Sequence, residues 1–255
     1  MNNIIFSHAN GFPAKSYSYL FDLLSPHTIH YLNKLGHGNY KVKKDWQPLA
    51  DELIEFAEKF EKPIIGIGHS VGGVATLYAA AKRKDVFSKI ILLDPPLVAG
   101  SYKRYLLLLT KVLGLVGHLL PIAKKAKNRK RQFHSKQEAL EYFKTKKLFQ
   151  LFHPSCLADY VEHGLEYNAS KDEYELAFSA DIEYDIFCSS PDIYPFSSTI
   201  NIPIYLIYSR NIVSIEDLKW YKKKFPQIEL IDFKAGHMFP LEEPERTASL
   251  IQSLL

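Results

Sequence analysis

The sequence predicts an α/β protein in which helices cover a mostly parallel sheet and a helical cap is inserted into the chain. Short apolar runs alternate with segments of helical periodicity, which is the pattern of a parallel sheet connected by helices. Between Asp94 and Ile204 this alternation stops and the pattern becomes mostly helical. We therefore expect residues 1–96 and 199–255 to form the core, with residues 97–198 as a helical cap over the ends of the strands.

The composition is that of a globular chain that can bury a large core. Of the 255 residues, 47% are hydrophobic and 24% are charged, which excludes disorder along the whole length. The net charge of +4 is too small to indicate a nucleic-acid partner, and the sequence shows no basic leader before a long apolar stretch. The most apolar run, 105–120, contains Lys111 and His118 and is shorter than the roughly 20 residues that span a bilayer. These features predict a cytoplasmic protein without a membrane span and leave its oligomeric state open.

The core segments supply the predicted strands and helices in order. A helix is expected over about 46–60, with Asp45 as its N-cap, because apolar residues recur on one face. A second helix is expected over 71–81, and a last one begins near Pro244, where proline suits the first turn. Six apolar runs predict strands, at residues 4–6, 29–32, 64–67, 90–93, 204–208 and 228–231.

The charge of the insertion is segregated. Residues 124–131 are strongly basic, the later part is acidic, and residues 135–138 have the form of a capping box before a helix. The two charged halves could attract each other, although a solvated surface is the default for each. The basic run could also attract an anionic substrate such as a coenzyme A thioester, or an acidic membrane surface. A solvated helix face is the simplest interpretation.

A serine stands at the junction between a predicted strand and a predicted helix. The pentapeptide 68–72, Gly-His-Ser-Val-Gly, directly follows strand 64–67 and overlaps the start of helix 71–81. Such a turn holds the serine in strained backbone geometry, and its two glycines remove β-carbons that would collide. It points the hydroxyl of Ser70 out of the sheet and leaves the amide of Val71 free at a helix N-terminus. The alternative is a glycine-rich connection with a bystander serine.

This turn and three other segments together resemble the α/β-hydrolase superfamily. The other segments are the loop 8–13 (His-Ala-Asn-Gly-Phe-Pro), the tripeptide 36–38 (Gly-His-Gly) and the late pair Gly236-His237. Only a few residues precede the first loop, so the resemblance implies a shortened α/β-hydrolase sheet of about six strands. Residues 33–38 lack the aspartate and arginine common here in the family, so a structural ionic contact of many relatives is expected to be absent.

The resemblance gives a role to four residues. Ser70 would be the nucleophile, and His237 would be the general base, because the base comes last in the chain order of this family. A histidine in a surface loop is the alternative for His237. The amides of Phe12 and Val71 would form the oxyanion hole, with a plain turn as the alternative for the loop that contains Phe12.

The acid that would orient His237 is less well defined. The family usually carries it after the penultimate strand, where this sequence has Ile212. Some relatives carry it after the preceding core strand, so Asp94 is the candidate here, and its alternative is a structural role at the strand end. An acid at Asp217 or Glu216, or a dyad without an acid, also remains open.

Several other residues are candidates for a substrate pocket. Aromatic and leucine residues at the two ends of the insertion suggest a site for an apolar acyl or aryl group, although packing onto the sheet would use the same residues. His69 adjoins the nucleophile but is expected to point away from it and to pack. His153 and His163 are too far apart for a zinc site, and no metal or organic cofactor is expected. The pocket candidates are His8, Asn10, His69, Leu97, Tyr102 and Met238.

These inferences predict a serine hydrolase that acts on a small molecule with an apolar moiety. It would cleave an ester or thioester through an acyl-enzyme on Ser70. Two alternatives stay open. The same residues could catalyse C–C bond hydrolysis or a lyase step, or the fold could serve as a non-catalytic binding module.

Overall fold

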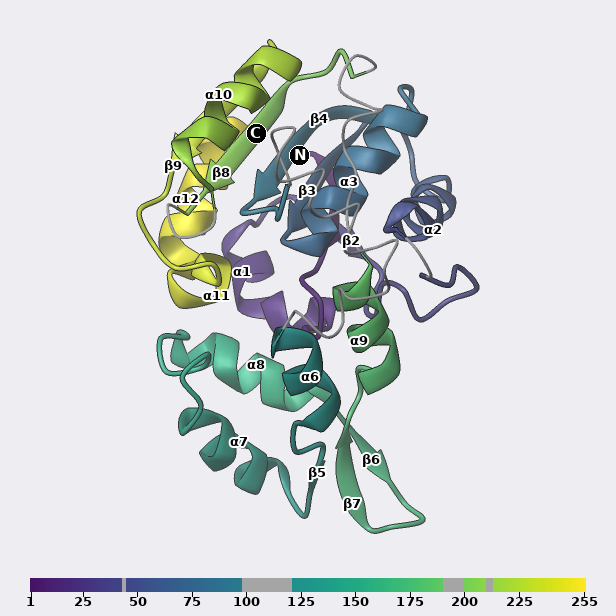
Figure 1. Ribbon diagram of the computed structural model, residues 1–255, viewed down its shortest axis with the longest axis vertical. Helices are drawn as coiled ribbons and strands as arrows, with labels where there is room; N and C mark the ends of the chain where they lie inside the picture. The colour runs from purple at the N-terminus through teal and green to yellow at the C-terminus, as the bar shows by residue number, and fades with distance from the viewer. Residues whose placement is uncertain (43–44, 98–120, 190–199, 210–212) are drawn as a thin grey trace.

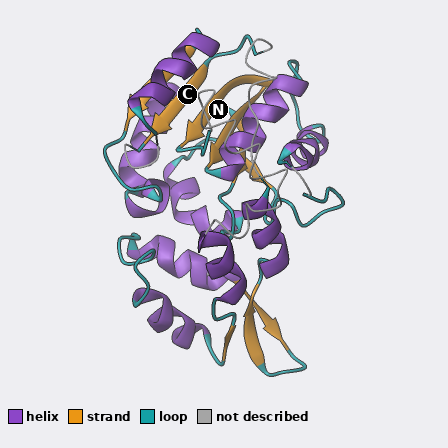
Figure 2. Cartoon of the chain, in the orientation of Figure 1, coloured by secondary structure: helices purple, strands orange, loops and turns teal. Residues whose placement is uncertain are grey.

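The six apolar runs of the core pair into a single sheet in the computed structural model (Figure 1 and Figure 2), which describes residues 1–42, 45–97, 121–189, 200–209 and 213–255. The strands lie in the order β2-β1-β3-β4-β8-β9, and every pairing in this sheet is parallel. This confirms the predicted sheet. The strand bounds are β1 Asn3–Ser7, β2 Thr28–Tyr31, β3 Ile64–His69, β4 Phe87–Leu93, β8 Ile204–Tyr208 and β9 Ile228–Asp232.

Helices cover both faces of this sheet, because its strands are apolar on both sides. In β4, Ile90 and Leu92 belong to one buried cluster, while Ile91 and Leu93 belong to the other. Side chains alternate along a strand, so each cluster lies on its own face. Each fully buried side chain of this kind stabilises the fold by about 1.5–3 kcal/mol. The core helices are η1 Ala14–Tyr17, α1 Ser18–Leu23, α2 Gln47–Ala57, α3 Val71–Lys82, α10 Ile215–Lys224, α11 Phe239–Glu242 and α12 Pro244–Leu254.

The two faces use different helices. Helices α2, α3 and α10 contribute Leu53, Val74 and Tyr221 to the cluster that contains Ile90. Segments η1, α1, α11 and α12 contribute to the other cluster, which also includes residues of the insertion. Most buried residues of the insertion belong to this second cluster, whereas Phe178 and Ile186, the latter in the last helix of the insertion, belong to the first.

The predicted N-cap of α2 is wrong by one position. The helix begins at Gln47, so Trp46 is its N-cap residue and makes no side-chain cap bond. The Asp45 carboxylate still accepts a hydrogen bond of 3.0 Å from the Gln47 amide. Asp45 thus binds the first amide of the helix, which has no partner within the helix, from the position before the N-cap. The spacing of residues in the sequence does not distinguish these two positions.

The insertion contains a small sheet in addition to the helices that the sequence predicts for it. It lies in the lower half of Figure 1, and its boundaries at 97 and 198 fall beside or within ranges that the structure does not describe. Its three-stranded sheet has the order β5-β7-β6 and is antiparallel. The elements are α6 Pro121–Asn128, β5 Gln132–Phe133, α7 Lys136–Lys144, α8 Pro154–Gly164, β6 Leu165–Asn168, β7 Glu173–Leu176 and α9 Ala180–Cys188.

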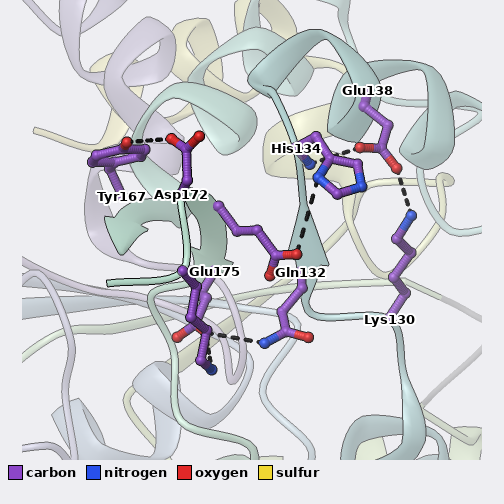
Figure 3. A network of polar contacts seen from close by, with 9 residues as sticks. Lys130, Gln132, His134, Glu138, Tyr167, Asp172 and Glu175 are labelled. Carbon is purple, nitrogen blue, oxygen red and sulfur yellow. Dashed lines mark hydrogen bonds and ion pairs between the residues drawn. The ribbon is translucent and has the colours of Figure 1, made fainter. Parts of the chain in front are cut away.

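Polar side-chain pairs hold the exposed part of this small sheet (Figure 3). Gln132 donates to Glu175 at 3.1 Å between β5 and β7, and Tyr167 donates to Asp172 at 2.6 Å across the hairpin. Short strands with polar side chains carry little apolar periodicity, which is why the sequence did not reveal them.

The capping box of α7 is only half formed. Ser135 accepts a hydrogen bond of 3.1 Å from the Glu138 amide, as predicted for an N-cap. The Glu138 carboxylate, however, accepts from the amide of His134 at 2.7 Å rather than from that of Ser135. The same carboxylate binds Lys130 at 2.6 Å (Figure 3).

None of the helices within the described ranges combines the length and apolar character needed to cross a bilayer.

Candidate active site

Ser70 lies at a sharp turn between β3 and α3. Its φ of 54° falls in the left-handed region, which costs energy for a residue with a β-carbon. A β-carbon at Gly68 would lie 2.4 Å from the Gly72 carbonyl oxygen, and one at Gly72 would lie 2.2 Å from that of Ser7. Glycine at position 68 thus allows the turn to close on itself, and glycine at position 72 allows it to approach the end of β1. This confirms the strained turn predicted from the pentapeptide.

The structure brings Ser70, His237 and Asp94 together in one hydrogen-bonded chain. The Nε2 atom of His237 lies 3.0 Å from the Ser70 hydroxyl oxygen. Its Nδ1 atom lies 2.7 Å from a carboxylate oxygen of Asp94. These residues follow β3, β9 and β4, whose carboxyl ends meet at one edge of the parallel sheet.

Asp94 is fixed by a residue that the sequence did not single out. Ser209 follows β8, and its amide donates to one carboxylate oxygen of Asp94 at 2.8 Å. Its hydroxyl donates at 2.8 Å to the other oxygen, the one nearest His237. Both residues are fully buried, so these bonds replace the water that the carboxylate loses. In the sequence, the only feature that could have indicated this role is the position of Ser209 directly after the penultimate strand.

The two alternative acids have a different place in the structure, at the start of α10. Asp217 forms a capping box with Ser214 at the start of α10, and Glu216 is an exposed residue of the first turn. Acidic side chains in the first turn stabilise a helix N-terminus, and this structural role accounts for the presence of both residues. Ile212, which stands at the usual acid position, lies outside the described residues.

The prediction that Phe12 supplies a free amide is wrong. Its N–H donates to the Ala9 carbonyl at 3.1 Å and closes a turn in which Gly11 has a φ of +79°. Within the described parts of the chain, the amides of Asn10 and Val71 have no hydrogen-bond partner. Val71 is the first residue of α3, where backbone N–H groups have no partner within the helix.

His8 and His69 are buried beside the site and do not line its cavity, so these pocket predictions are wrong. The Leu35 amide donates to Nε2 of His8 at 2.7 Å, which leaves Nδ1–H to donate to the Ala9 carbonyl. His69 lies between Tyr17, whose hydroxyl is 2.7 Å from Nδ1, and the His237 carbonyl, 3.0 Å from Nε2. The prediction that His69 packs is correct, and it also anchors the backbone of His237.

These two histidines make the stability of the protein depend on pH. Burial lowers the pKa of His8 to about 4 and holds the pKa of His69 well below its ordinary range. The unfolded chain therefore takes up these protons first, and the free energy of unfolding should decrease as the pH falls below roughly 6.5. For His8 the loss should reach about 3 kcal/mol near pH 4.

Urea denaturation between about pH 7.5 and pH 5 tests this expectation. His8→Gln keeps an acceptor for Leu35 and cannot become charged, so its stability should depend less on pH than that of the wild type. An equal pH dependence in both proteins would contradict the assignment.

A cavity of about 680 Å³ opens next to Ser70 and His237. Asn10 and Met238 line it, as predicted. Leu97 does not, because it is buried in the core cluster of the opposite face, and Tyr102 lies outside the described residues. Aromatic side chains form much of the cavity wall. They come from the loop after β1, from α7 and the segment that follows α7, and from α9: Phe12, Tyr142, Phe143, Phe149 and Phe187.

The charged halves of the insertion do attract each other, so the default of two solvated surfaces is wrong in part. Arg129 pairs with Glu183 at 2.6 Å, and Glu183 is 4% exposed. Arg131 donates to the carbonyls of Leu176 and Phe178. Burial raises the pKa of Glu183, while the two arginines oppose this.

Within the described ranges, no three His, Cys, Asp or Glu side chains are grouped to hold a metal ion.

Comparisons with known proteins agree with this architecture. A monoglyceride lipase of Rattus norvegicus is 32% identical over 75 residues, which cover 26% of this chain and only 25% of that enzyme. Lipase LipV of Mycobacterium tuberculosis is 24% identical over 226 residues, 87% of this chain and 80% of that lipase. A thioesterase domain from the curacin biosynthetic pathway has a TM-score of 0.77 at 16% identity, covering 99% of this chain and 91% of that domain.

The family assignment rests on a match along almost the whole chain. The sequence profile described as "Alpha/beta hydrolase family" matches residues 4–250. The strand order and the strained serine turn agree with it. The protein is therefore an enzyme that belongs to the alpha/beta hydrolase family.

Proposed function

We propose that the protein is a serine hydrolase that cleaves an ester or thioester through an acyl-enzyme on Ser70. The observation that carries this proposal is the hydrogen-bonded chain from Ser70 through His237 to buried Asp94. A serine hydroxyl is a weak nucleophile until a base takes its proton, and a histidine held by a carboxylate is suited to that task.

The geometry supports the following sequence of proton transfers. Oγ of Ser70 attacks the substrate carbonyl carbon while Nε2 of His237 takes the hydroxyl proton. His237 then gives this proton to the leaving alcohol or thiol as the carbonyl re-forms. Water attacks the acyl-enzyme carbonyl while His237 takes its proton, and His237 then returns this proton to Oγ of Ser70 as the acid is released. Asp94 keeps its charge throughout and stabilises the imidazolium.

The negative charge that develops on the substrate carbonyl oxygen must be stabilised by hydrogen-bond donors. The Val71 amide is proposed as one donor, since it points from the N-terminus of α3 and the helix dipole favours an anion there. The Asn10 amide is proposed as the second in place of Phe12, because Asn10 borders the cavity beside Ser70. Together they would stabilise the tetrahedral intermediate.

The choice of ester or thioester rests on the cavity and on the relatives. The aromatic wall suits an apolar acyl group. Two related proteins are lipases by name, and a solved structure of similar fold is a thioesterase domain. The chemistry needs no cofactor.

A substrate panel with purified protein tests the proposal. We expect turnover of p-nitrophenyl esters or acyl thioesters with medium-length acyl chains, and mass spectrometry of the quenched reaction should detect the acyl group on Ser70. If neither class is hydrolysed and no covalent intermediate forms, the proposed function is wrong.

A further inference from the structure

Several positively charged side chains line the largely apolar cavity beside Ser70. Beyond His237, the described residues that line it include four cationic side chains, Lys125, Arg129, Lys130 and Lys146, and a single carboxylate, Glu183. The remaining wall is largely aromatic and aliphatic. Low-dielectric walls concentrate the field of such charges inside a cleft. The cavity therefore combines an apolar surface with an excess of positive charge.

Two of these cations already have acidic partners. Arg129 pairs with Glu183 at 2.6 Å. Lys130 pairs with Glu138 at 2.6 Å, as Figure 3 shows, and its ammonium group also lies 4.9 Å from the ring centre of Phe133. These pairs hold the two side chains in place and reduce the charge that they present to a ligand.

The other two cations are not neutralised by a carboxylate within the described ranges. Neither Lys125 nor Lys146 takes part in any ion pair among the residues that the structure describes. Lys146 lies over the ring of Tyr142, 4.0 Å from its centre, which positions its ammonium group at the cavity wall. Their charge is available to a bound anion.

The fold presents Lys125 to the cavity from an amphipathic helix. Helix α6 buries Ala123 and Ala126, while Lys124 is exposed and does not line the cavity. Ile122 and Leu148 line the cavity yet are 52% and 49% exposed, so its mouth is apolar next to the two lysines. The basic run is thus not only a solvated helix face, because part of it borders the cavity.

We propose that the enzyme prefers substrates that carry an anionic group, a carboxylate or phosphate, separated by an apolar segment from the carbonyl that Ser70 attacks. This inference rests on the proposed function, and it names the substrate class of the same site. The apolar segment would lie on the aromatic wall, and Lys125 and Lys146 would bind the anion. Since the anion could belong to the acyl group or to the leaving group, both arrangements must be tested.

Two matched substrate pairs test the preference. The first compares p-nitrophenyl hexanoate with the mono-p-nitrophenyl ester of adipic acid, in which a carboxylate replaces the terminal methyl group. The second compares hexanoyl-N-acetylcysteamine with hexanoyl-coenzyme A, whose leaving group carries phosphates. We expect kcat/KM to be roughly tenfold higher for the anionic member of at least one pair at low salt. Raising the salt concentration to about 0.5 M should reduce this preference and leave the neutral substrates unaffected.

Charge-removal variants locate the effect. For Lys125→Met combined with Lys146→Met, the ratio of kcat/KM between the anionic and the neutral member of a pair should fall from roughly ten to about one. The control combines Lys124→Met with Lys147→Met, which removes the same charge from exposed positions outside the cavity lining. This control should keep the preference.

The outcomes separate the two proposals. Turnover of neutral substrates without any preference for the anionic partner in either pair would overturn the inference alone. An equal loss of preference in the control variant would also overturn it, because the effect would then come from the overall charge. If no ester or thioester is hydrolysed, the proposed function fails and the inference fails with it.

Discussion

Replacing Ser70 with alanine is expected to lower kcat for ester hydrolysis by about 10⁶-fold, because the nucleophile and base act as a unit. The substitution removes only the Oγ atom, which lies 3.0 Å from Nε2 of His237 and accounts for no other hydrogen bond among the described residues. Alanine tolerates the left-handed backbone at this position no worse than serine does. The loss of rate should therefore occur without a loss of stability.

A fluorophosphonate probe provides the second measurement for this variant. The wild type should become labelled at Ser70, and Ser70→Ala should not be labelled at all. Ser16→Ala is a matched control, since Ser16 is buried and its hydroxyl has no partner within the described structure. Labelling that persists in Ser70→Ala while the control behaves normally would place the nucleophile elsewhere.

Replacing Asp94 with asparagine should lower kcat by up to about 10⁴-fold with little change in KM. An amide of the same shape can still accept the hydrogen bond from the Ser209 backbone, so the fold around it is kept. Its NH₂ group, however, would donate to Nδ1 of His237, and the histidine would then carry its proton on Nε2, facing Ser70. In that tautomer His237 cannot act as a base.

Two further variants distinguish a catalytic from a structural carboxylate. Ser209→Ala removes one hydrogen bond to Asp94 and should lower kcat only severalfold, since the carboxylate keeps its charge and the bond from the Ser209 amide. Asp217→Asn should weaken the cap of α10 and leave kcat unchanged. Steady-state kinetics and thermal denaturation measure both effects. A nearly normal kcat for Asp94→Asn would remove Asp94 from the proposed mechanism.

The sequence by itself determined the parts of the protein that depend on local patterns. Apolar runs located the six core strands within a few residues, and they are longest in the inner strands β3 and β4, which are buried on both faces. The turn at Ser70 was equally visible, because only glycine at Gly68 and Gly72 permits the backbone contacts that it makes. The small sheet of the insertion was missed, since strands with polar exposed faces leave no such pattern.

Only the tertiary structure decided which groups meet at the site. The family resemblance favoured Asp94 but left Asp217 open, because the decision depends on which carboxylate is hydrogen-bonded to His237 in the folded chain. Nor could it show that the Phe12 amide is used by a turn while that of Asn10 is free, since hydrogen bonds of single backbone groups follow from the folded path of the chain. The same holds for Lys125 of α6 and Lys146 of the turn segment after α7, which the fold brings to one cavity.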